Sequence, residues 1–401
     1  MQTRIAGARV VLADDVVETD IVIEDGRIAT IGGSGPAGRT IDAAGLFLAP
    51  AMVDIHGDAF ERQIMPRPGV FFPIDAALLE SDRQLAANGI ATAYHALTLS
   101  WEPGLRSIER AETFLDALAA LEPRLTVENR VQLRWETFAF EAVDLIERAV
   151  SGPHVPSIAF NDHTSMEMRD PDIPVQERLF EHNPDFAVAD RQSRRFKDRL
   201  ANSARRAGLG VDAYGDLICA IWERRPHVPE TIARIAALGR KRAAPMLSHD
   251  DTQHETRDFY RALGVTIAEF PMQVTVARAA RAAGDAIAFG APNVVRGGSH
   301  IGSPSAADMV EDGLCDMLAS DYFYPSMLAA VARLHREKRA PLPRLWSLVS
   351  KGPAAASGLA DRGEIAVGKR ADLVLVDWPD DATPAVKHTL SAGRTAYHAT
   401  H

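Results

Sequence analysis

The sequence contains very little cysteine, since only Cys219 and Cys315 occur among its 401 residues. Two thiols are too few for the disulfide framework that holds small secreted domains together. The first residues, MQTRIAGARVVLADD, also lack the basic and then apolar layout of a secretory signal. We therefore expect a cytoplasmic protein.

Long apolar runs and an excess of positive charge are missing as well. No run approaches the roughly 18 uninterrupted apolar residues of a membrane span. The formal net charge is −10, whereas nucleic acids and anionic membrane surfaces attract proteins through clustered Lys and Arg. We expect no nucleic-acid and no membrane partner, and instead a small-molecule substrate, which a few local cations would bind if it is phosphorylated. The composition is compatible with a homo-oligomer.

The apolar residues that are present, 46% of the chain, are enough for a large core. Between residues 51 and 352, strand-like segments alternate with amphipathic helical ones. The strand candidates are MVDIHG, IATAYHALTL, RVQLRWETF, PSIAFND, APMLSHD, VTIAEF, AIAFGAP and CDMLASD. Because parallel neighbours require crossover helices, this alternation predicts an α/β fold with a TIM-like (β/α)8 barrel.

Both ends of the chain show a different pattern, with short strands and turn glycines. Residues 1–50 contain ARVVLAD, DIVIEDGRIATIGG and RTIDAAGLFLAP, and residues 353–401 contain GEIAVGKRADLVLVDWP and HTLSAGRTAYHAT. We expect the two ends to form one small β-sandwich domain beside the barrel.

One connection in the barrel is too long for a single crossover helix. It runs from His163 to the strand candidate that contains His249, and the part around residues 164–207 is strongly charged. We predict an insertion that overhangs the barrel mouth. Interleaved Asp and Glu favour solvated helical faces, and the alternative is a lid whose basic groups hold an anionic substrate.

Residue types that bind metals recur where the strand candidates end. They are His56, Asp58, Glu136, His163, His249 and Asp321. The carboxyl ends of parallel barrel strands meet at one mouth, so we expect these side chains to converge there. Any isolated His-x-Asp pair is better explained by a surface turn, and it is the joint occurrence that predicts a metal site.

Imidazole and carboxylate ligands suit Zn²⁺, Mn²⁺ or Fe²⁺. A set of three histidines and three carboxylates exceeds what one tetrahedral zinc requires. The set therefore favours two divalent metal ions, bridged by Glu136 or by hydroxide, which activate water for hydrolysis.

A glycine-rich segment after the seventh strand candidate predicts a phosphate site. In APNVVRGGSH, Arg296 precedes Gly297, Gly298 and Ser299, so a cation and a run of backbone N–H groups share one loop. The alternative is a plain turn with Arg296 in a salt bridge. Arg67, between two prolines in MPRPGV, is a second candidate for binding the substrate.

Several of these segments resemble the amidohydrolase superfamily. LAPAMVDIHGD and GEIAVGKRADLVLVD are similar to its first metal-binding motif and to its split β domain. DIHGD, MPRPGV, AANGIAT, LRWE, NDH, LSHDD, TIAEFP, GAPNVVRGGSH, LASDYFYP and DRGEIAVGKRADLVL resemble, in this order, the alpha-D-ribose 1-methylphosphonate 5-triphosphate diphosphatases of the carbon-phosphorus lyase pathway. GAPNVVRGGSH is the most specific of these segments.

The resemblance implies a metal-dependent hydrolase with its ligands at the six positions named above. It implies cleavage between the α and β phosphates of a 5-triphosphorylated ribose and release of pyrophosphate. Asp321 would bind metal and accept a proton from water, and His300 or Asp250 would donate a proton to the leaving group. The alternative is a related amidohydrolase that cleaves a C–N bond of a cyclic amide or heterocycle.

Some residues depart from the pattern of these relatives. Ala59 stands where the diphosphatases typically have Asn, and Thr164 to Met168 replace a Pro-Gly-Gln-Arg-like run. We expect this run to line the mouth, where Glu167 would repel a polyphosphate. His163 and His249 end the fourth and fifth strand candidates, whereas superfamily relatives usually have their histidines on the fifth and sixth.

Overall fold

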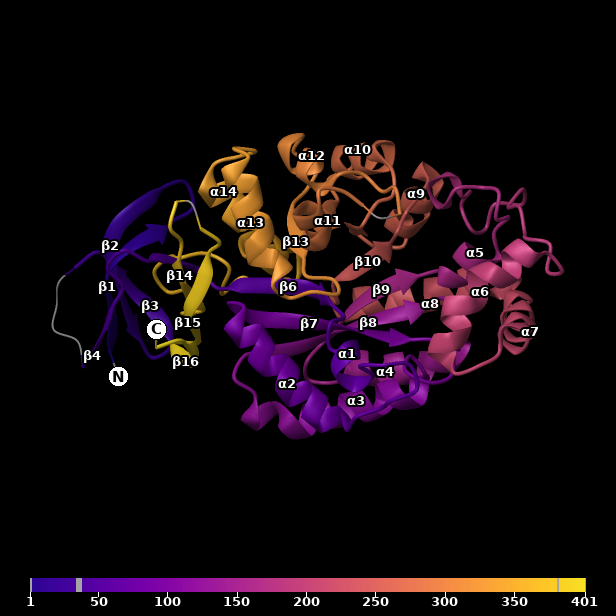
Figure 1. The fold of residues 1–401 in the computed structure, drawn as a ribbon, viewed down its shortest axis with the longest axis horizontal. Helices are drawn as coiled ribbons and strands as arrows, with labels where there is room; N and C mark the ends of the chain where they lie inside the picture. Colours follow the sequence, from indigo (N-terminus) through magenta and orange to yellow (C-terminus); the bar gives the residue numbers. More distant parts are fainter. Residues whose placement is uncertain (1, 34–37, 300, 381, 401) are drawn as a thin grey trace.

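Two eight-stranded sheets organise the chain (Figure 1). The computed structural model describes residues 2–33, 38–299, 301–380 and 382–400. One sheet forms the barrel, and the two ends of the chain form the other. We call the second one the end sheet.

The barrel sheet consists of parallel strands in chain order. They are β6 (Met52–Gly57), β7 (Ile90–Leu99), β8 (Glu128–Glu136), β9 (Ser157–Asn161), β10 (Met246–His249), β11 (Ile267–Glu269), β12 (Ala286–Gly290) and β13 (Met317–Ala319). The first and last strands meet, because the Asp58 N–H donates to the Asp321 carbonyl and the Asp321 N–H donates to the His56 carbonyl, each at 2.9 Å. The predicted (β/α)8 barrel and its eight strands are confirmed.

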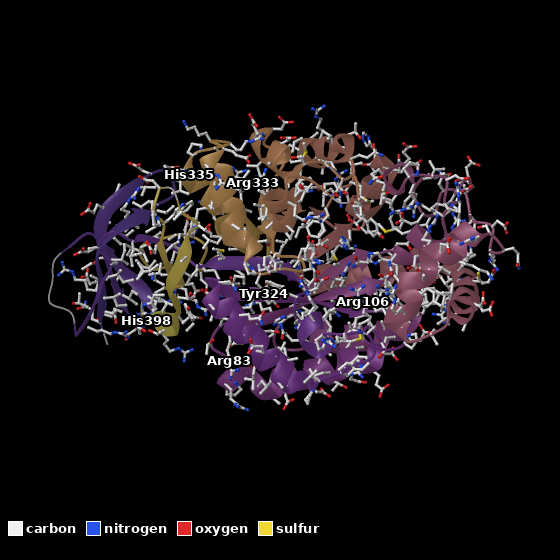
Figure 2. The ribbon with its side chains drawn as sticks, in the orientation of Figure 1. Arg83, Arg106, Tyr324, Arg333, His335 and His398 are labelled. Atoms are coloured by element: carbon white, nitrogen blue, oxygen red, sulfur yellow. The ribbon has the colours of Figure 1, made fainter. Side chains whose placement is uncertain are left out.

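Helices surround the barrel because each buries one apolar face against it. They include α1 (Glu61–Ile64), α2 (Ile74–Ala87), α3 (Ile108–Leu121), α4 (Val143–Ser151), α8 (Val228–Lys241), α9 (His254–Ala262), α10 (Val274–Ala282), α11 (Ala291–Arg296), α12 (Ala306–Glu311), α13 (Ser326–Arg336), α14 (Leu342–Ser347) and α15 (Lys351–Ala356). In α3, the Ser107 hydroxyl caps the N-terminus by accepting from the Arg110 N–H, and Phe114 is buried. Figure 2 places Tyr324 in the interior and Arg83 near the surface.

The end sheet combines strands from both ends of the chain. Its strands are β1 (Thr3–Val11), β2 (Val16–Glu24), β3 (Arg27–Ile31), β4 (Arg39–Asp42), β5 (Phe47–Pro50), β14 (Leu373–Asp377), β15 (Ala385–Ser391) and β16 (Arg394–His398). Their order is β16-β15-β14-β5-β1-β2-β3, with β4 also paired to β1, so hydrogen bonds join them into one continuous sheet. Ile5, Ile21, Leu48 and Leu373 are fully or almost fully buried in its own core.

The polypeptide passes between the two sheets at two places. The first is short, since β5 ends at Pro50 and β6 begins at Met52. At the second, α15 extends past residue 352, where we expected the barrel to end, and packs against β6 and β13. This helix therefore belongs structurally to the barrel.

The long connection between β9 and β10 is helical. It contains α5 (His163–Met168), η3 (Val175–Glu177), α6 (Arg194–Ala207), α7 (Val211–Trp222), η4 (Arg225–His227) and α8. In Figure 1 it lies at the end of the barrel that is remote from the end sheet. Arg199 donates to the carbonyls of Glu167 and Arg169, and Arg206 pairs with Glu102. These contacts use the arginines to hold the insertion together, which favours a structural role over a basic lid.

No helix in the described part of the chain is both long enough and apolar enough to cross a membrane.

Glu128 links the barrel to the C-terminal segment. It lies at the start of β8 and accepts hydrogen bonds from Arg362, at 2.6 Å, and from Arg370. Burial alone would raise the pKa of Glu128, but the positive charges of Arg362 and Arg130 and these hydrogen bonds lower it to about 2 from an ordinary 4.5. A carboxyl group with a lowered pKa stabilises the fold above its unfolded pKa, and this stabilisation is lost as the pH falls towards the folded pKa.

We predict that Glu128→Gln lowers the free energy of unfolding at pH 7 by an amount on the order of 2 kcal/mol. The difference in unfolding free energy between the variant and the wild type should narrow below about pH 4.5. In that range the Glu128 carboxylate of the wild type takes up a proton when the chain unfolds, which lowers the stability of the wild type. Urea denaturation at pH 7, 4 and 3 measures it. Glu24→Gln, at an exposed position of β2, is the control. A difference that does not change with pH would contradict the prediction.

Candidate metal centre

Two groups of metal-ligand side chains lie where the barrel strands end. The first group is His56, Asp58 and Asp321, and the second is His163, His249 and Asp250. Within each group, one ligand atom of every residue lies within 4.8 Å of the others. Five of the six residues predicted as ligands are found in these groups. Asp250, predicted as a proton donor, completes the second.

In the first group, Glu269 determines how His56 is oriented. The Nδ1 of His56 contacts Glu269 Oε1 at 2.9 Å, and both side chains are buried. Because a carboxylate accepts a proton there, the Nε2 of His56 is the nitrogen that is available to a metal. Burial opposes the charged form of His56, but Glu269 outweighs it and raises the pKa of His56.

The two carboxylates of the first group repel each other. Burial and then the nearby charge of Asp58 raise the pKa of Asp321 to about 7. Asp321 also has a positive φ of 56°, which the closing hydrogen bonds of the barrel maintain. Carboxylates held together in a buried site are stabilised by a cation, so this donor set fits a divalent metal ion.

In the second group, Glu136 orients His163. His163 is the first residue of α5, and its Nδ1 lies 2.5 Å from Glu136 Oε1 while its backbone N–H donates to Oε2 at 3.1 Å. Both carboxylate oxygens therefore contact His163, and Nε2 of His163 is left for a metal. We expected Glu136 to be a metal ligand, with either Glu136 or hydroxide as the bridge, but in this geometry both of its carboxylate oxygens contact His163.

His249 completes the second group as a neutral ring. Burial and then the charge of Arg134 lower the pKa of His249 well below its ordinary value. Its Nδ1 has no hydrogen-bond partner among the described residues, and it lies 3.7 Å from both Asp250 Oδ1 and Glu269 Oε2. Asp250 has a φ of 56°, and burial raises its pKa. A neutral imidazole beside a carboxylate suits a metal site.

The sequence interpretation missed Glu269. It ends β11, the sixth barrel strand, and is completely buried. Its Oε1 contacts His56 Nδ1 and accepts from Gln132 Nε2, both at 2.9 Å, and its Oε2 faces His249. One carboxylate therefore lies between a histidine of each group. Its place at the end of VTIAEF was the signal that could have revealed it.

Arg134 was missed as well. It precedes Glu136 by two residues on β8, and alternate residues of a strand point to the same side. Its Nη1 lies 3.5 Å from Asp58 Oδ2, and its Nη2 lies 3.1 Å from His249 Nε2 and 3.5 Å from His163 Nε2. The guanidinium thus contacts both groups.

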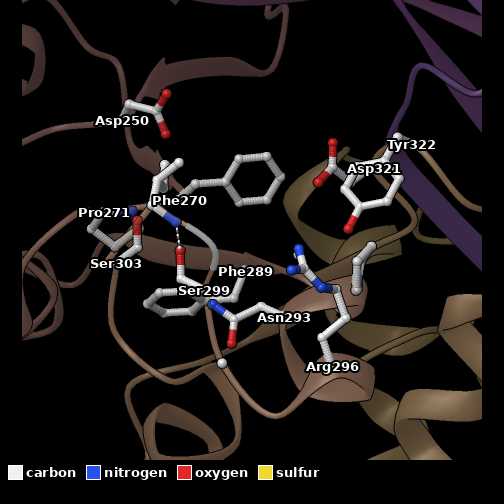
Figure 3. A pocket seen from close by; sticks show the side chains of 14 residues that line it. Asp250, Phe270, Pro271, Phe289, Asn293, Arg296, Ser299, Ser303, Asp321 and Tyr322 are labelled. Atoms are coloured by element: carbon white, nitrogen blue, oxygen red, sulfur yellow. Dashed lines mark hydrogen bonds between the residues drawn. The ribbon is translucent and has the colours of Figure 1, made fainter. Parts of the chain in front are cut away.

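A pocket of about 540 Å³, which includes open solvent, lies beside the two groups (Figure 3). Its lining includes Asp250, Asp321, Phe270, Phe289, Asn293, Arg296, Gly298, Ser299 and Tyr322. Figure 3 shows the Arg296 side chain extending from α11 towards Asp321 and Tyr322. Acidic groups and a cation therefore share one cavity.

The predicted phosphate loop contributes unequally to this pocket. Arg296 forms no salt bridge or hydrogen bond with any described residue, so the alternative of a salt-bridged turn finds no support. Gly298 and Ser299 line the pocket, whereas Gly297 ends α11 with a φ of 81°. Arg67 is exposed and is not among the lining residues. His300 lies outside the described residues.

The run from Thr164 to Met168 does not present its acidic side chain to the mouth. Glu167 accepts hydrogen bonds from the hydroxyls of Ser203 and Tyr214 in the insertion, the latter at 3.1 Å. Thr164 is buried and accepts from Trp101 Nε1 at 2.9 Å. The expectation that Glu167 repels an anionic substrate is therefore wrong, because its carboxylate packs against α6 and α7.

Comparison with known proteins identifies the family. Residues 198–397 match the Amidohydrolase family. Over 385 residues the chain is 31% identical to the alpha-D-ribose 1-methylphosphonate 5-triphosphate diphosphatase of Escherichia coli (strain K12), which covers 94% of this chain and 96% of that protein. The chain belongs to the amidohydrolase superfamily.

The strand count of this amidohydrolase places His163 after the fourth strand and His249 on the fifth, as predicted.

Other relatives of this amidohydrolase bear different names. The D-hydantoinase of Rhizobium radiobacter is 47% identical over 57 residues, which are 14% of this chain and 12% of that protein. A D-hydantoinase structure from Bacillus sp. AR9 has a TM-score of 0.62 at 14% identity and covers 99% of this chain and 95% of its own. An adenosine deaminase from Xanthomonas campestris with bound zinc has a TM-score of 0.61 at 13% identity, over 98% and 92% of the two chains. The two structures show the shared fold.

We predict that Glu269→Gln weakens metal binding roughly tenfold to a hundredfold, because the anionic acceptor that orients His56 is lost. Chelator competition with Zn²⁺ measures the affinity, and metal analysis of the dialysed protein measures the content. Glu255→Gln, on the exposed side of α9, is the matched control. Equal affinities of Glu269→Gln and wild type would show that Glu269 does not position the ligands.

Proposed function

We propose that this amidohydrolase is a metal-dependent phosphoanhydride hydrolase. Its substrate would be alpha-D-ribose 1-methylphosphonate 5-triphosphate, cleaved between the α and β phosphates to release pyrophosphate in phosphonate catabolism. The observation that carries the proposal is Arg296, a cation without a protein partner in the described structure, in a pocket that it shares with Asp250 and Asp321. Similarity to the Escherichia coli diphosphatase along nearly the whole chain supports the same substrate.

The donor set supports two divalent metal ions, of Zn²⁺, Mn²⁺ or Fe²⁺. His56, Asp58 and Asp321 would hold one ion, and His163, His249 and Asp250 the other. When bound, a divalent cation lowers the pKa of a bound water and polarises a phosphoryl or carbonyl oxygen. Glu136 and Glu269 keep the Nε2 atoms of His163 and His56 free for this role.

Residues that line the pocket would carry out the proton transfers and bind the substrate. Asp321 lines the pocket, and the oxygen of its carboxylate that does not hold the ion would accept a proton from the attacking water. Asp250 lines the same pocket, and the oxygen of its carboxyl group that does not hold the ion would return a proton to the leaving phosphate. Arg296 and the loop of Gly298 and Ser299 hold phosphate oxygens next to these carboxylates.

Hydrolysis of a cyclic amide is the second candidate function. The local identity to D-hydantoinase favours it, and a carbonyl carbon is attacked by activated water in the same way as phosphorus. Arg296 separates the two candidates, because a neutral cyclic amide offers no anionic oxygen to pair with a guanidinium.

The proposal predicts pyrophosphate release when the protein is incubated with Mn²⁺ and the triphosphate, followed by phosphorus NMR. Asp321→Asn should lose at least ~10³-fold in rate, because it removes a metal ligand and the proton acceptor together. Asp14→Asn, at an exposed position outside the strands, is the control and should keep the wild-type rate. Turnover of hydantoins without any pyrophosphate release would instead establish the second candidate.

We predict that Arg296→Gln raises KM for the triphosphate roughly tenfold to a hundredfold, as expected for the loss of one charge-assisted hydrogen bond. Steady-state kinetics of pyrophosphate release measures KM and kcat. Arg278→Gln, on the exposed face of α10, is the matched control. An unchanged KM in Arg296→Gln would place the phosphates elsewhere.

A further inference from the structure

Arg134 is a buried cation in the middle of the proposed metal centre. Its side chain is 9% exposed. Its guanidinium contacts Asp58 of the first group and His163 and His249 of the second, and its Nε lies 3.3 Å from Asn161 Oδ1. Such a residue is expected to have strong acceptors, because a buried charge that is poorly paired is costly.

The acceptors of Arg134 are weak for a guanidinium. Hydrogen bonds between charged groups are ordinarily about 2.7–2.9 Å long, whereas the contact with Asp58 Oδ2 measures 3.5 Å. Asp58 is the only carboxylate within 4.0 Å of the guanidinium among the described residues. The other partners are the neutral Oδ1 of Asn161 and two imidazole nitrogens. The guanidinium therefore lacks a short hydrogen bond to an anionic acceptor.

Arg134 and a metal ion require the same lone pair of His163. The Nε2 of His163, which faces Arg134, is the atom left for metal binding, because Glu136 holds Nδ1 of the same ring. A nitrogen that ligates a metal cannot accept a hydrogen bond from a guanidinium. Metal binding at His163 therefore deprives Arg134 of this acceptor and places it beside further positive charge.

We propose that Arg134 binds an anionic phosphoryl oxygen of the substrate inside the metal centre and thereby couples anion binding to metal binding. This inference rests on the proposed function and names a contact that the pocket does not include. A guanidinium presents several N–H donors in a fixed plane, which matches the oxygens of a phosphoryl group. The anion replaces the acceptor that Arg134 loses to the metal at His163, and it offsets the added charge.

Two binding measurements test this role without turnover. The first is the affinity of the protein for Mn²⁺ alone, and the second is the affinity of the Mn²⁺-loaded protein for inorganic pyrophosphate. In Arg134→Gln, we expect Mn²⁺ to bind at least about tenfold more tightly, because a competing cation is gone. We expect pyrophosphate to bind roughly tenfold to a hundredfold more weakly, because its charged donor is gone.

Arg134→Lys separates charge from geometry. It keeps the positive charge, so its Mn²⁺ affinity should stay near that of the wild type, whereas the lost planar fork should still weaken pyrophosphate binding. Arg278→Gln serves as the control and should change neither affinity. The lysine variant also keeps the test valid if the glutamine variant does not fold, as circular dichroism would show.

Unchanged pyrophosphate affinity in both Arg134 variants would overturn the proposal and leave Arg134 as a structural cation. An unchanged or weaker Mn²⁺ affinity in folded Arg134→Gln would overturn the coupling in the same way. Neither readout depends on catalysis. Failure of the proposed function would appear separately, as absence of pyrophosphate release from the triphosphate by a wild-type protein that binds both probes.

Discussion

The arrangement of the proposed metal centre depends on one buried carboxylate, that of Glu269. It holds the Nδ1 of His56 with one oxygen and faces the Nδ1 of His249 with the other. The contact with His56 leaves the Nε2 of that ring available to the site. Among the described residues, Glu269 is the only one whose side chain forms a hydrogen bond with the His56 ring, which otherwise packs against the rings of Phe270 and His249.

Negative charge is concentrated around this carboxylate, and such a concentration favours a bound cation. Asp58, Asp321, Asp250 and Glu136 all lie close to the same two groups of ligands. The single arginine or lysine that contacts these groups among the described residues is Arg134, and its contact with the carboxylate of Asp58 is 3.5 Å long. The barrel can maintain such a concentration only because its closed sheet fixes every strand end, so that repulsion cannot separate the side chains.

Strand periodicity predicted the barrel and most of the residues in the two candidate ligand groups, because parallel strands that are buried on both faces leave a continuous apolar signature. His56, Asp58, His163, His249 and Asp321 could be found in this way, since each follows such a run. Periodicity does not show which side chain a carboxylate at the end of a strand contacts. Glu136 was therefore expected as a metal ligand and, with hydroxide as the alternative, as the bridge, although its oxygens contact His163. Glu269 was missed although it ends a strand in the same manner.

The contacts of Glu167 and the extent of α15 show a second limit of prediction from the sequence. The hydroxyls of Ser203 and Tyr214, which hold Glu167, come from helices that begin about 30 residues or more further along the chain, so a local pattern could not predict the partner. The short helix α15 extends past residue 352, where we expected the barrel to end, and it packs against β6 and β13. Long-range packing decided both cases.

The first ligand group lies on the seam of the barrel. His56 and Asp58 come with the first strand and Asp321 follows the last one, and backbone hydrogen bonds between these same residues join the two edges. A nascent chain that has not yet produced its eighth strand therefore cannot assemble this half of the centre. An ion bound there would hold the first and last strands together. It would then stabilise the closed barrel as well as take part in the reaction.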